Sequence, residues 1–215
     1  LMKKGCILCL LISVISLPLI AQNIIYSNLK ELLTQHGDTT AVLRVEKRSR
    51  NQIVLTGGAD YRITAGDDES MCRRLKKRCF AVRDEKGNLY LNCRKLRYKK
   101  LRFGAWYAPA VQLGKNIYFC AMPLGSVIGG NFVEEDDVKL GGNIGDALAA
   151  SSLVTKRVCY ELNGETGKVD FLGKDRMLQL LKNYPELKQA YLKDDSQEAK
   201  HTFKYLLELQ NKQNK

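Results

Sequence analysis

The 215-residue sequence predicts an α+β fold in which antiparallel β-hairpins pack with helices and the C-terminal region is helical. Two observations predict it. Short apolar stretches alternate with turn-forming residues from about residue 40 to residue 172, which favours hairpins, and beyond Gly173 the apolar residues recur at helical spacing instead. We therefore divide the chain into a leader over residues 1–21, a β-rich domain with two short helices over residues 22–173, and a helical segment over residues 174–215.

Residues 1–21 have the pattern of a signal peptide. Two lysines precede an apolar run that ends at Ala21, and export requires a positive segment, an apolar segment and a small residue at the cut. Cleavage there would leave Gln22 as the mature N-terminus and no stable membrane span. A retained anchor is the alternative, although Pro18 interrupts a run that is already short for a bilayer. We expect an exported protein of the periplasm, the cell surface or the medium.

The β-rich domain begins with a short helix over residues 28–36. Leu29, Leu32 and Leu33 form its apolar side, and Gly37 ends it. Asp67 or Asp68 caps a second, basic helix that runs to about Arg78.

Four hairpins are expected around these helices. Each joins two stretches of alternating apolar residues across a polar or glycine-containing turn: residues 40–46 with 52–55, residues 80–82 with 89–91, residues 108–113 with 116–121, and residues 158–162 with 168–172. In the second hairpin, a four-residue turn over residues 84–87 predicts that Val82 faces Leu89.

The remaining segments are a loop and the C-terminal helices. Residues 124–153 are rich in glycine and predict a long ordered loop with a short helix over residues 146–152. Toward the C-terminus three helices are expected: Asp175 caps the first, Pro185 begins the second, and Ser196 caps the third.

Five cysteines remain once the leader, which holds Cys6 and Cys9, is removed. An odd number leaves at least one thiol unpaired and excludes the disulfide framework of small secreted proteins. Cys72 and Cys79 lie about 10 Å apart along a helix, which is too far for a bridge between them. We expect most of the five, which also include Cys93, Cys120 and Cys159, to be buried small residues with free thiols.

Positive charge is concentrated in one stretch. The net charge is +12, and +10 without the leader lysines, yet residues 71–102 alone carry +11 because thirteen lysines and arginines oppose only Asp84 and Glu85. If the basic helix and the second hairpin share a face, that face would attract phosphate, sulfate or carboxylate groups over about 8 Å. The candidate anion-binding residues are Arg73, Arg74, Lys76, Lys77, Arg94, Lys95, Arg97, Lys99, Lys100 and Arg102.

Three aromatic residues near this stretch could stack on a ligand: Tyr98, Trp106 and Tyr107. The alternative is that the basic residues are a solvated outer face while the aromatic rings fill the core. The partners that suit an exported basic protein are anionic glycans or lipid head groups. Nucleic acid is not expected, because no nucleic-acid-binding module is recognisable.

No catalytic residue, cofactor or metal site is predicted. His36 and His201 are isolated, and the sequence lacks the motifs of serine hydrolases, zinc proteases, zinc-binding cysteines and phosphate-binding loops. The acidic run over residues 134–137 is interpreted as solvated, and Asp60 is expected to hydrogen-bond a turn or Arg62. We expect a non-catalytic protein. The alternative is a hydrolase or redox enzyme whose cysteine or aspartate centre assembles only in three dimensions.

Segments spread over most of the mature chain carry a resemblance to known sequences. They are Asn28-Leu29-Lys30 with Gly37-Asp38, Gly57-Gly58-Ala59-Asp60-Tyr61-Arg62-Ile63, Arg102-Phe103-Gly104 with Trp106-Tyr107-Ala108-Pro109-Ala110, Pro123-Leu124-Gly125-Ser126, and Tyr184-Pro185-Glu186-Leu187. Together they resemble a family of small exported Bacteroidetes proteins that share a domain of unknown function. The resemblance implies export from a Gram-negative cell, and it transfers no catalytic or binding residue.

Overall fold

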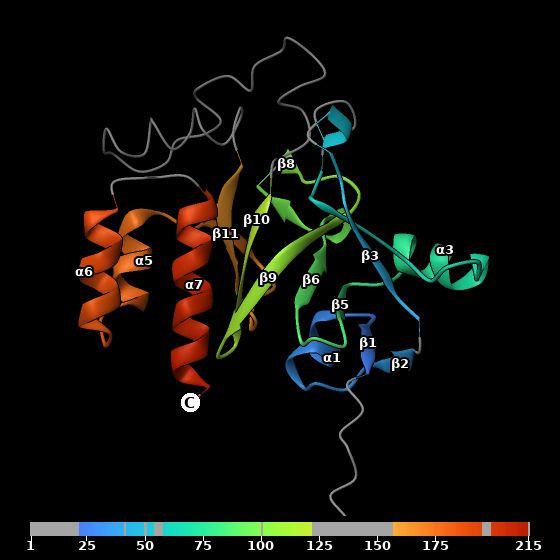
Figure 1. The fold of residues 1–215 in the computed structure, drawn as a ribbon, viewed down its shortest axis with the longest axis horizontal. Coiled ribbons are helices and arrows are strands. Elements are labelled where there is room, and N and C mark those ends of the chain that lie inside the picture. The colour runs from blue at the N-terminus through green and yellow to red at the C-terminus, as the bar shows by residue number, and fades with distance from the viewer. Residues whose placement is uncertain are drawn as a thin grey trace, which may run out of the picture.

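The computed structural model describes residues 22–40, 42–49, 51–53, 58–99, 101–121, 157–194 and 199–214. The predicted leader, the predicted loop over residues 124–153 and the predicted cap Ser196 lie outside these ranges. The described elements confirm the α+β class: an antiparallel sheet is flanked by helices, the last of them at the C-terminal end (Figure 1). None of the described helices is long and apolar enough to span a bilayer.

The main sheet has the strand order β12-β11-β10-β9-β6-β5-β1-β2. A further pair joins it at β9, because β4 pairs with β9 and β3 pairs with β4, while β7 and β8 form a separate two-stranded ribbon. The strands are β1 (Asn23–Tyr26), β2 (Asp38–Thr40), β3 (Arg44–Lys47), β4 (Tyr61–Thr64), β5 (Ala81–Arg83), β6 (Leu89–Asn92), β7 (Arg97–Tyr98), β8 (Leu101–Arg102), β9 (Tyr107–Leu113), β10 (Asn116–Ala121), β11 (Val158–Leu162) and β12 (Val169–Phe171).

The helices lie at both ends of the sheet. In Figure 1, α5, α6 and α7 cover one end and α3 lies at the other. The helices are α1 (Leu29–Leu33), α3 (Glu69–Lys77), the 3-10 helix η1 (Cys93–Lys95), α5 (Lys174–Leu180), α6 (Pro185–Lys193) and α7 (Ala199–Gln213).

Alternation along β9 assigns its side chains to different hydrophobic clusters. Val111 and Leu113 point to one side of the sheet, where they pack with buried leucines of α6 and α7. Tyr107 points to the same side but packs with Leu75 of α3. Ala108 points to the opposite side, into a cluster that includes α1, so the sheet is covered on both faces.

Three aromatic rings form the centre of the cluster around α1. Phe103 lies with its ring centroid 4.7 Å from that of Tyr160 and 5.5 Å from that of Phe119, in edge-to-face geometry. All three side chains are fully buried. Such contacts contribute about 0.5–1.5 kcal/mol per pair beyond the burial of apolar area.

The predicted first hairpin is wrong. Residues 40–46 do not form one strand, because β2 pairs with β1 whereas β3 pairs with β4. Of the predicted partner strand over residues 52–55, the described residues 52–53 are helical, and residues 54–55 lie outside the described ranges. Strand β1 was not predicted at all. Apolar alternation identifies a strand but does not identify its partner, which is chosen by the rest of the sheet.

The second hairpin exists, but its register differs from the prediction by one residue. Val82 pairs with Tyr90 rather than Leu89, because Asn88 joins the turn and its carbonyl accepts a hydrogen bond from Asp84 N. Every residue of β6 is buried, so both faces of the strand lie against the protein interior. The third and fourth hairpins are confirmed, with turns at Gly114 and at residues 163–167.

Helix caps follow the local sequence in most cases. Asn28 accepts a hydrogen bond from the first turn of α1, Asp68 rather than Asp67 does so for α3, and Pro185 begins α6 as predicted. Asp175 is not a cap. Gly173 occupies that position, and Asp175 lies in the first turn of α5.

A disulfide joins Cys120 of β10 to Cys159 of β11, which are directly opposite in the register. The bridge agrees with the expectation that most of the five thiols are free, but the sequence did not identify this pair, because adjacent strands bring together residues that are 39 positions apart. Closing a loop of that length stabilises the folded state by about 3–4 kcal/mol. The free cysteines of the described chain are Cys72, Cys79 and Cys93.

A half-buried carboxylate attaches α5 to the sheet. Glu161 of β11 accepts hydrogen bonds from Nε and Nη2 of Arg176, both at 2.8 Å, and from the Tyr118 hydroxyl at 2.9 Å and Asn116 Nδ2 at 2.6 Å. Burial alone would raise the pKa of Glu161, but these donors outweigh it and lower the pKa below its ordinary value. The carboxylate therefore stabilises the fold in its ionised form.

Thiol titration checks the cysteine assignment. Mature protein unfolded without reductant should expose three thiols, and reduction should raise the count to five, since one bridge forms among the five cysteines. Alkylation before reduction, followed by peptide mapping, should leave Cys120 and Cys159 unmodified. A count of one or five before reduction would contradict the structure.

A second prediction concerns Glu161. Glu161→Gln should lower the free energy of unfolding by about 1–3 kcal/mol at pH 7, because the hydrogen bonds lose their charge. Since the folded pKa is lowered, this contribution is complete above the unfolded pKa of about 4.3 and is lost as the pH falls through the folded value. Denaturant titrations should show the gap between wild type and variant closing below about pH 4.

The control for this prediction is Glu165→Gln. Glu165 forms an ion pair with Lys115, but both side chains are exposed, so its removal should change the stability little. Equal effects of the two substitutions would contradict the role assigned to Glu161.

Candidate anion-binding surface

The first group of predicted cations lies on η1 and the β7–β8 ribbon. Arg97 and Arg102 are register partners in the ribbon and both are exposed. Tyr98, which directly follows Arg97, points into the core. Strand alternation therefore directs the arginines outward. The exposed cations of this group are Arg94, Lys95, Arg97, Lys99 and Arg102, and Lys100 lies outside the described residues.

The second group lies on α3. Arg73, Lys76 and Lys77 are exposed, whereas Leu75 between them is fully buried against the sheet. Arg74 has a different role: it forms an ion pair with Asp38 of β2 and donates a hydrogen bond to Ser27 Oγ at 3.4 Å. Among the predicted cations in the described residues, Arg74 alone has an ion pair. It links α3 to the edge of the sheet.

One buried side chain connects the two groups. Asn92 Nδ2 donates to the carbonyl of Leu75, at 3.1 Å, and to that of Cys79, at 2.9 Å, at the C-terminal end of α3. Its Oδ1 accepts from Arg94 N at 3.1 Å and so caps η1. The end of α3 that carries Lys76 and Lys77 is therefore held beside the start of η1.

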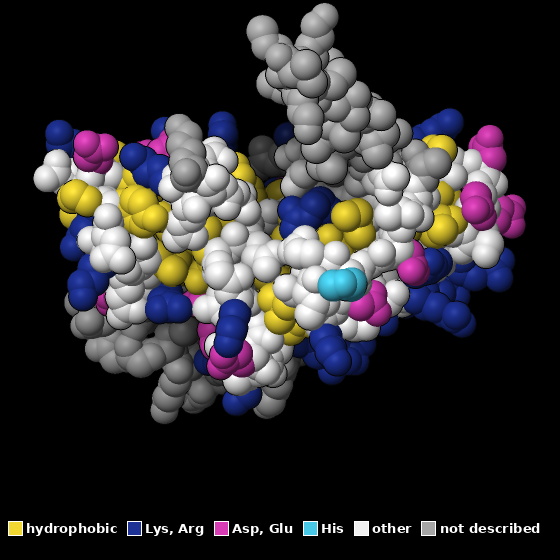
Figure 2. Space-filling model, turned by 90° about the horizontal axis from the view of Figure 1, so that it is seen from below, with side chains coloured by type: hydrophobic (Ala, Val, Ile, Leu, Met, Phe, Trp, Pro, Cys, Tyr) yellow, Lys and Arg dark blue, Asp and Glu magenta, His cyan; other side chains and the backbone are white. Residues whose placement is uncertain are grey.

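α3 and the β7–β8 ribbon cover opposite faces of the sheet, and the two groups of cations adjoin where α3 ends beside η1. We call their exposed members together the basic surface: Arg73, Lys76, Lys77, Arg94, Lys95, Arg97, Lys99 and Arg102. Figure 2 shows lysine and arginine side chains gathered at the end of the molecule where α3 lies. Cations at the last turn of α3 also suit the negative end of the helix dipole.

Two of the three predicted stacking residues are unavailable to a ligand. Tyr98 and Tyr107 are each about 2% exposed. The Tyr98 ring packs with Tyr160 at a centroid distance of 5.5 Å, and the Tyr107 hydroxyl donates to the carbonyl of Leu75 at 2.7 Å. The prediction is wrong for these two because both residues alternate inward, and a strand's facing depends on its partners.

Trp106 is partly exposed and lies among arginines that the sequence analysis did not select. The Cζ atom of Arg48 is 5.1 Å from the ring centroid, and that of Arg62 is 5.7 Å from it. Arg48 is itself buried and donates to the carbonyls of Ala59, at 2.7 Å, and Gln52, at 2.9 Å. No sequence signal could find this cluster, because three separate segments supply it.

Asp60 is committed to a partner other than the expected one. The Asp60 carboxylate forms an ion pair with Arg157, with 2.5 Å between Oδ1 and Nη1. It does not pair with Arg62 or with a turn, as the sequence had suggested. Arg157 directly precedes β11, so the pair bridges residues 97 positions apart. Sequence proximity to Arg62 was misleading, because the two side chains do not meet.

The described residues offer little for catalysis. Burial raises the pKa of the Cys79 thiol to about 11 and that of Cys93 to about 12, so both remain protonated at neutral pH. His201 pairs with Asp194, and His36 contacts the carbonyl of Thr34. In the ranges covered by the structure, no group of three or more histidine, cysteine, aspartate or glutamate side chains could hold a metal ion.

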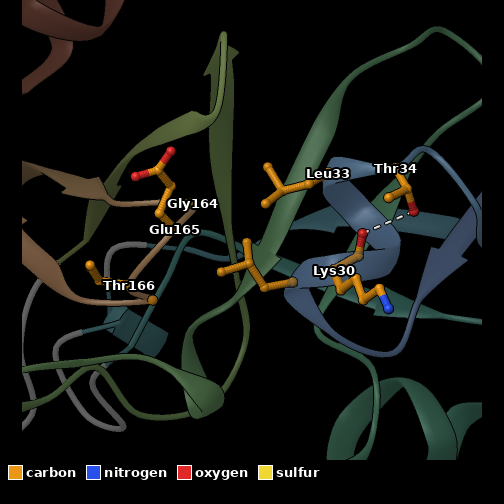
Figure 3. Close-up of a pocket in the computed structure, with 8 residues that line it drawn as sticks. Lys30, Leu33, Thr34, Gly164, Glu165 and Thr166 are labelled. Atoms are coloured by element: carbon orange, nitrogen blue, oxygen red, sulfur yellow. Dashed lines mark hydrogen bonds between the residues drawn. The ribbon is translucent and has the colours of Figure 1, made fainter.

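A cavity of about 470 Å³ lies between α1 and the turn of the β11–β12 hairpin (Figure 3). Leu29 and Leu33 line it from the helix, and residues 164–167 line it from the turn. The Glu165 side chain extends away from the leucines and pairs with Lys115 at 2.8 Å. Lys30 and Glu165 are the charged residues of the lining, and the Glu165 carboxylate is already paired with Lys115.

The sequence profile of a family of unknown function, DUF6563, matches residues 24–213. The chain belongs to this family. The match spans every described strand except the first residue of β1, along with all of the described helices, and it confirms the resemblance to a family that shares a domain of unknown function. No curated protein and no solved structure matches the chain.

Asn92→Ala tests the connection between the two groups of cations. The substitution should lower the free energy of unfolding by about 2–4 kcal/mol, because the buried Cys79 carbonyl and the Arg94 amide lose their partner and the Leu75 carbonyl keeps only the Tyr107 hydroxyl. Asn88→Ala, in the exposed β5–β6 turn, is the matched control and should cost clearly less. Denaturant titration of both variants measures the difference, and equal costs would show that Asn92 does not join α3 to η1.

Proposed function

We propose that this DUF6563 protein is exported and acts without catalysis, by binding an anionic partner of the cell envelope or the extracellular medium through the basic surface. The observation that carries the proposal is the exposed, uncompensated charge. Eight cations of the basic surface are exposed, and none of them has an ion pair among the described residues. A folded protein gains nothing in stability from such crowding, since like charges repel.

The chemistry of the surface suits oxyanions. Arginine presents a planar fork of donors and lysine presents a point charge, and both favour phosphate, sulfate and carboxylate groups. Anionic glycans and lipid head groups carry these groups in the envelope. Attraction among exposed charges extends over a Debye length of about 8 Å at physiological salt, so binding should depend strongly on ionic strength.

Two features support export to the periplasm, the cell surface or the medium. The leader pattern in residues 1–21 is one. The Cys120–Cys159 bridge is the other, because stable disulfides are typical of proteins that leave the reducing cytosol. The non-catalytic role is supported by the high pKa values of the Cys79 and Cys93 thiols, which leave them unsuited to act as nucleophiles.

Retention on immobilised heparin tests the proposal. The wild-type mature protein should bind and should elute at a defined salt concentration. The slope of log affinity against log salt should fall by up to about one for each charge contact removed. The test variant replaces five cations of η1 and the ribbon with glutamine: Arg94, Lys95, Arg97, Lys99 and Arg102.

A matched control removes the same number of charges from the helices at the other end of the sheet. It replaces Lys174, Lys182, Lys193, Lys200 and Lys204 with glutamine. The control should keep most of the retention, whereas the test variant should lose it. Equal retention of the two variants, or wild-type retention that ignores salt, would refute a specific anion-binding surface.

A further inference from the structure

The loop that carries Trp106 is held in an unusual backbone conformation. Gly104 has φ 78° and Trp106 has φ 83°. A bulky residue at positive φ costs about 1–3 kcal/mol and persists only where its surroundings enforce it. Phe103 and Tyr107 on either side are buried, so the loop exposes one ring between two core residues.

Backbone contacts enforce this conformation. The Trp106 carbonyl accepts from Cys93 N at 2.9 Å, and the Ala105 carbonyl accepts from Ala59 N at 3.4 Å. A Cβ at Gly58 would lie 2.2 Å from the Ala105 oxygen, so only glycine permits the approach. These backbone hydrogen bonds offset the strain at Trp106, while the indole ring remains partly exposed.

The two arginines beside the Trp106 ring differ in the exposure of their side chains. Arg48 is buried and its guanidinium donates to backbone carbonyls. Arg62 is exposed, and among the described residues it has no ion pair. Glu46 is its register partner across β3 and β4, but their charged atoms do not come within ion-pair distance. Asp60, two residues earlier, is already paired with Arg157.

A guanidinium that lies over an aromatic ring uses its flat side for that contact. Its N–H donors point outward in the plane and match the two oxygens of a carboxylate or sulfate group. The exposed part of the indole ring adds an apolar surface beside that fork, which suits the C–H face of a sugar ring. The combination fits a sugar unit that bears an acidic substituent.

The site also continues into the basic surface. The Trp106 carbonyl is bonded to Cys93 N, the first residue of η1, and the exposed Arg94 and Lys95 follow directly. A polymer with one acidic sugar at Arg62 could therefore place further acidic groups on η1.

We propose that Arg62, positioned by the Trp106 ring, binds the carboxylate or sulfate group of a sugar unit in an anionic glycan. This inference rests on the proposed anion-binding function and names its partner and its recognition residue. Arg62 contacts the ligand, and Trp106 is a positioning residue that also offers its ring edge.

Trp106 is the single tryptophan of the chain, so its fluorescence reports on this site alone. Titration of the mature protein with a heparin hexasaccharide should give a saturable change in emission. A neutral glucose hexamer should give none. Inorganic sulfate at equal sulfate concentration should bind at least about tenfold more weakly, because a free anion lacks the sugar contact and the added contacts on η1. Equal affinity for inorganic sulfate would overturn the glycan assignment.

Arg62→Gln should weaken the affinity for the hexasaccharide about five- to tenfold, measured by calorimetry. Arg44→Gln is the matched control: it removes one exposed charge from β3, on the same side of the β3–β4 pair, and should weaken binding less than about twofold. Equal weakening by the two substitutions would overturn the inference.

A double-mutant cycle tests the positioning role. Glycine adopts φ 83° without strain, so Trp106→Gly should fold, and its unfolding midpoint confirms this. Its affinity should fall at least as much as that of Arg62→Gln, because the ring contact is lost as well, and the double variant should lose less than the sum of the two single losses. Additive losses would contradict positioning of Arg62 by Trp106.

The outcomes separate this inference from the proposed function. If the wild type fails to bind heparin, the proposed function fails and this inference fails with it. If the wild type binds and Arg62→Gln matches Arg44→Gln, the basic surface stands and this inference alone falls. If vesicles containing anionic lipid change the Trp106 emission as the hexasaccharide does, and Arg62→Gln abolishes that change, the assignment to a sugar unit is wrong.

Discussion

The burial of strands β6 and β9 on both faces is the constraint on which the rest of the molecule depends. All four residues of β6 are buried, and β9 sends Ala108 to one cluster and Val111 to another. A sheet that is apolar on both sides requires a cover on each. Helices α5–α7 and α3 supply one cover, and α1 with the β7–β8 ribbon supplies part of the other. Neither β6 nor β9 carries a charged side chain.

Asn92 is the polar exception within β6, and it explains how separate basic segments come together. Its amide must be satisfied once it is buried, and its partners are the carbonyls of Leu75 and Cys79 at the end of α3 and the amide of Arg94 in η1. Helix ends leave such groups unpaired, so a single side chain can attach both. The positions of Lys76, Lys77 and Arg94 follow from this satisfaction of backbone groups, without any favourable contact among the cations themselves.

In the Trp106 loop the backbone is strained, whereas at Asn92 backbone groups are satisfied. The loop between Phe103 and Tyr107 keeps Trp106 at positive φ although its neighbours are ordinary core residues. Contacts from Ala59 and Cys93 over-determine that conformation, so the strain is stored at a partly exposed ring flanked by arginines. Rigid placement of ring and guanidinium lowers the entropy lost when a ligand binds.

The sequence by itself determined the features that depend on near neighbours: the third and fourth hairpins, the start of α3 at Asp67 or Asp68, Pro185 at the start of α6, and the concentration of charge in residues 71–102. Only the tertiary structure decided the β3–β4 pairing, the register of Val82, the Cys120–Cys159 bridge, the inward facing of Tyr98 and Tyr107, and the arginines around Trp106. The physical reason is range. Caps and tight turns are set by bonds within a few residues, whereas strand partners, disulfides and cation–ring contacts join residues that are adjacent only after the whole sheet has closed.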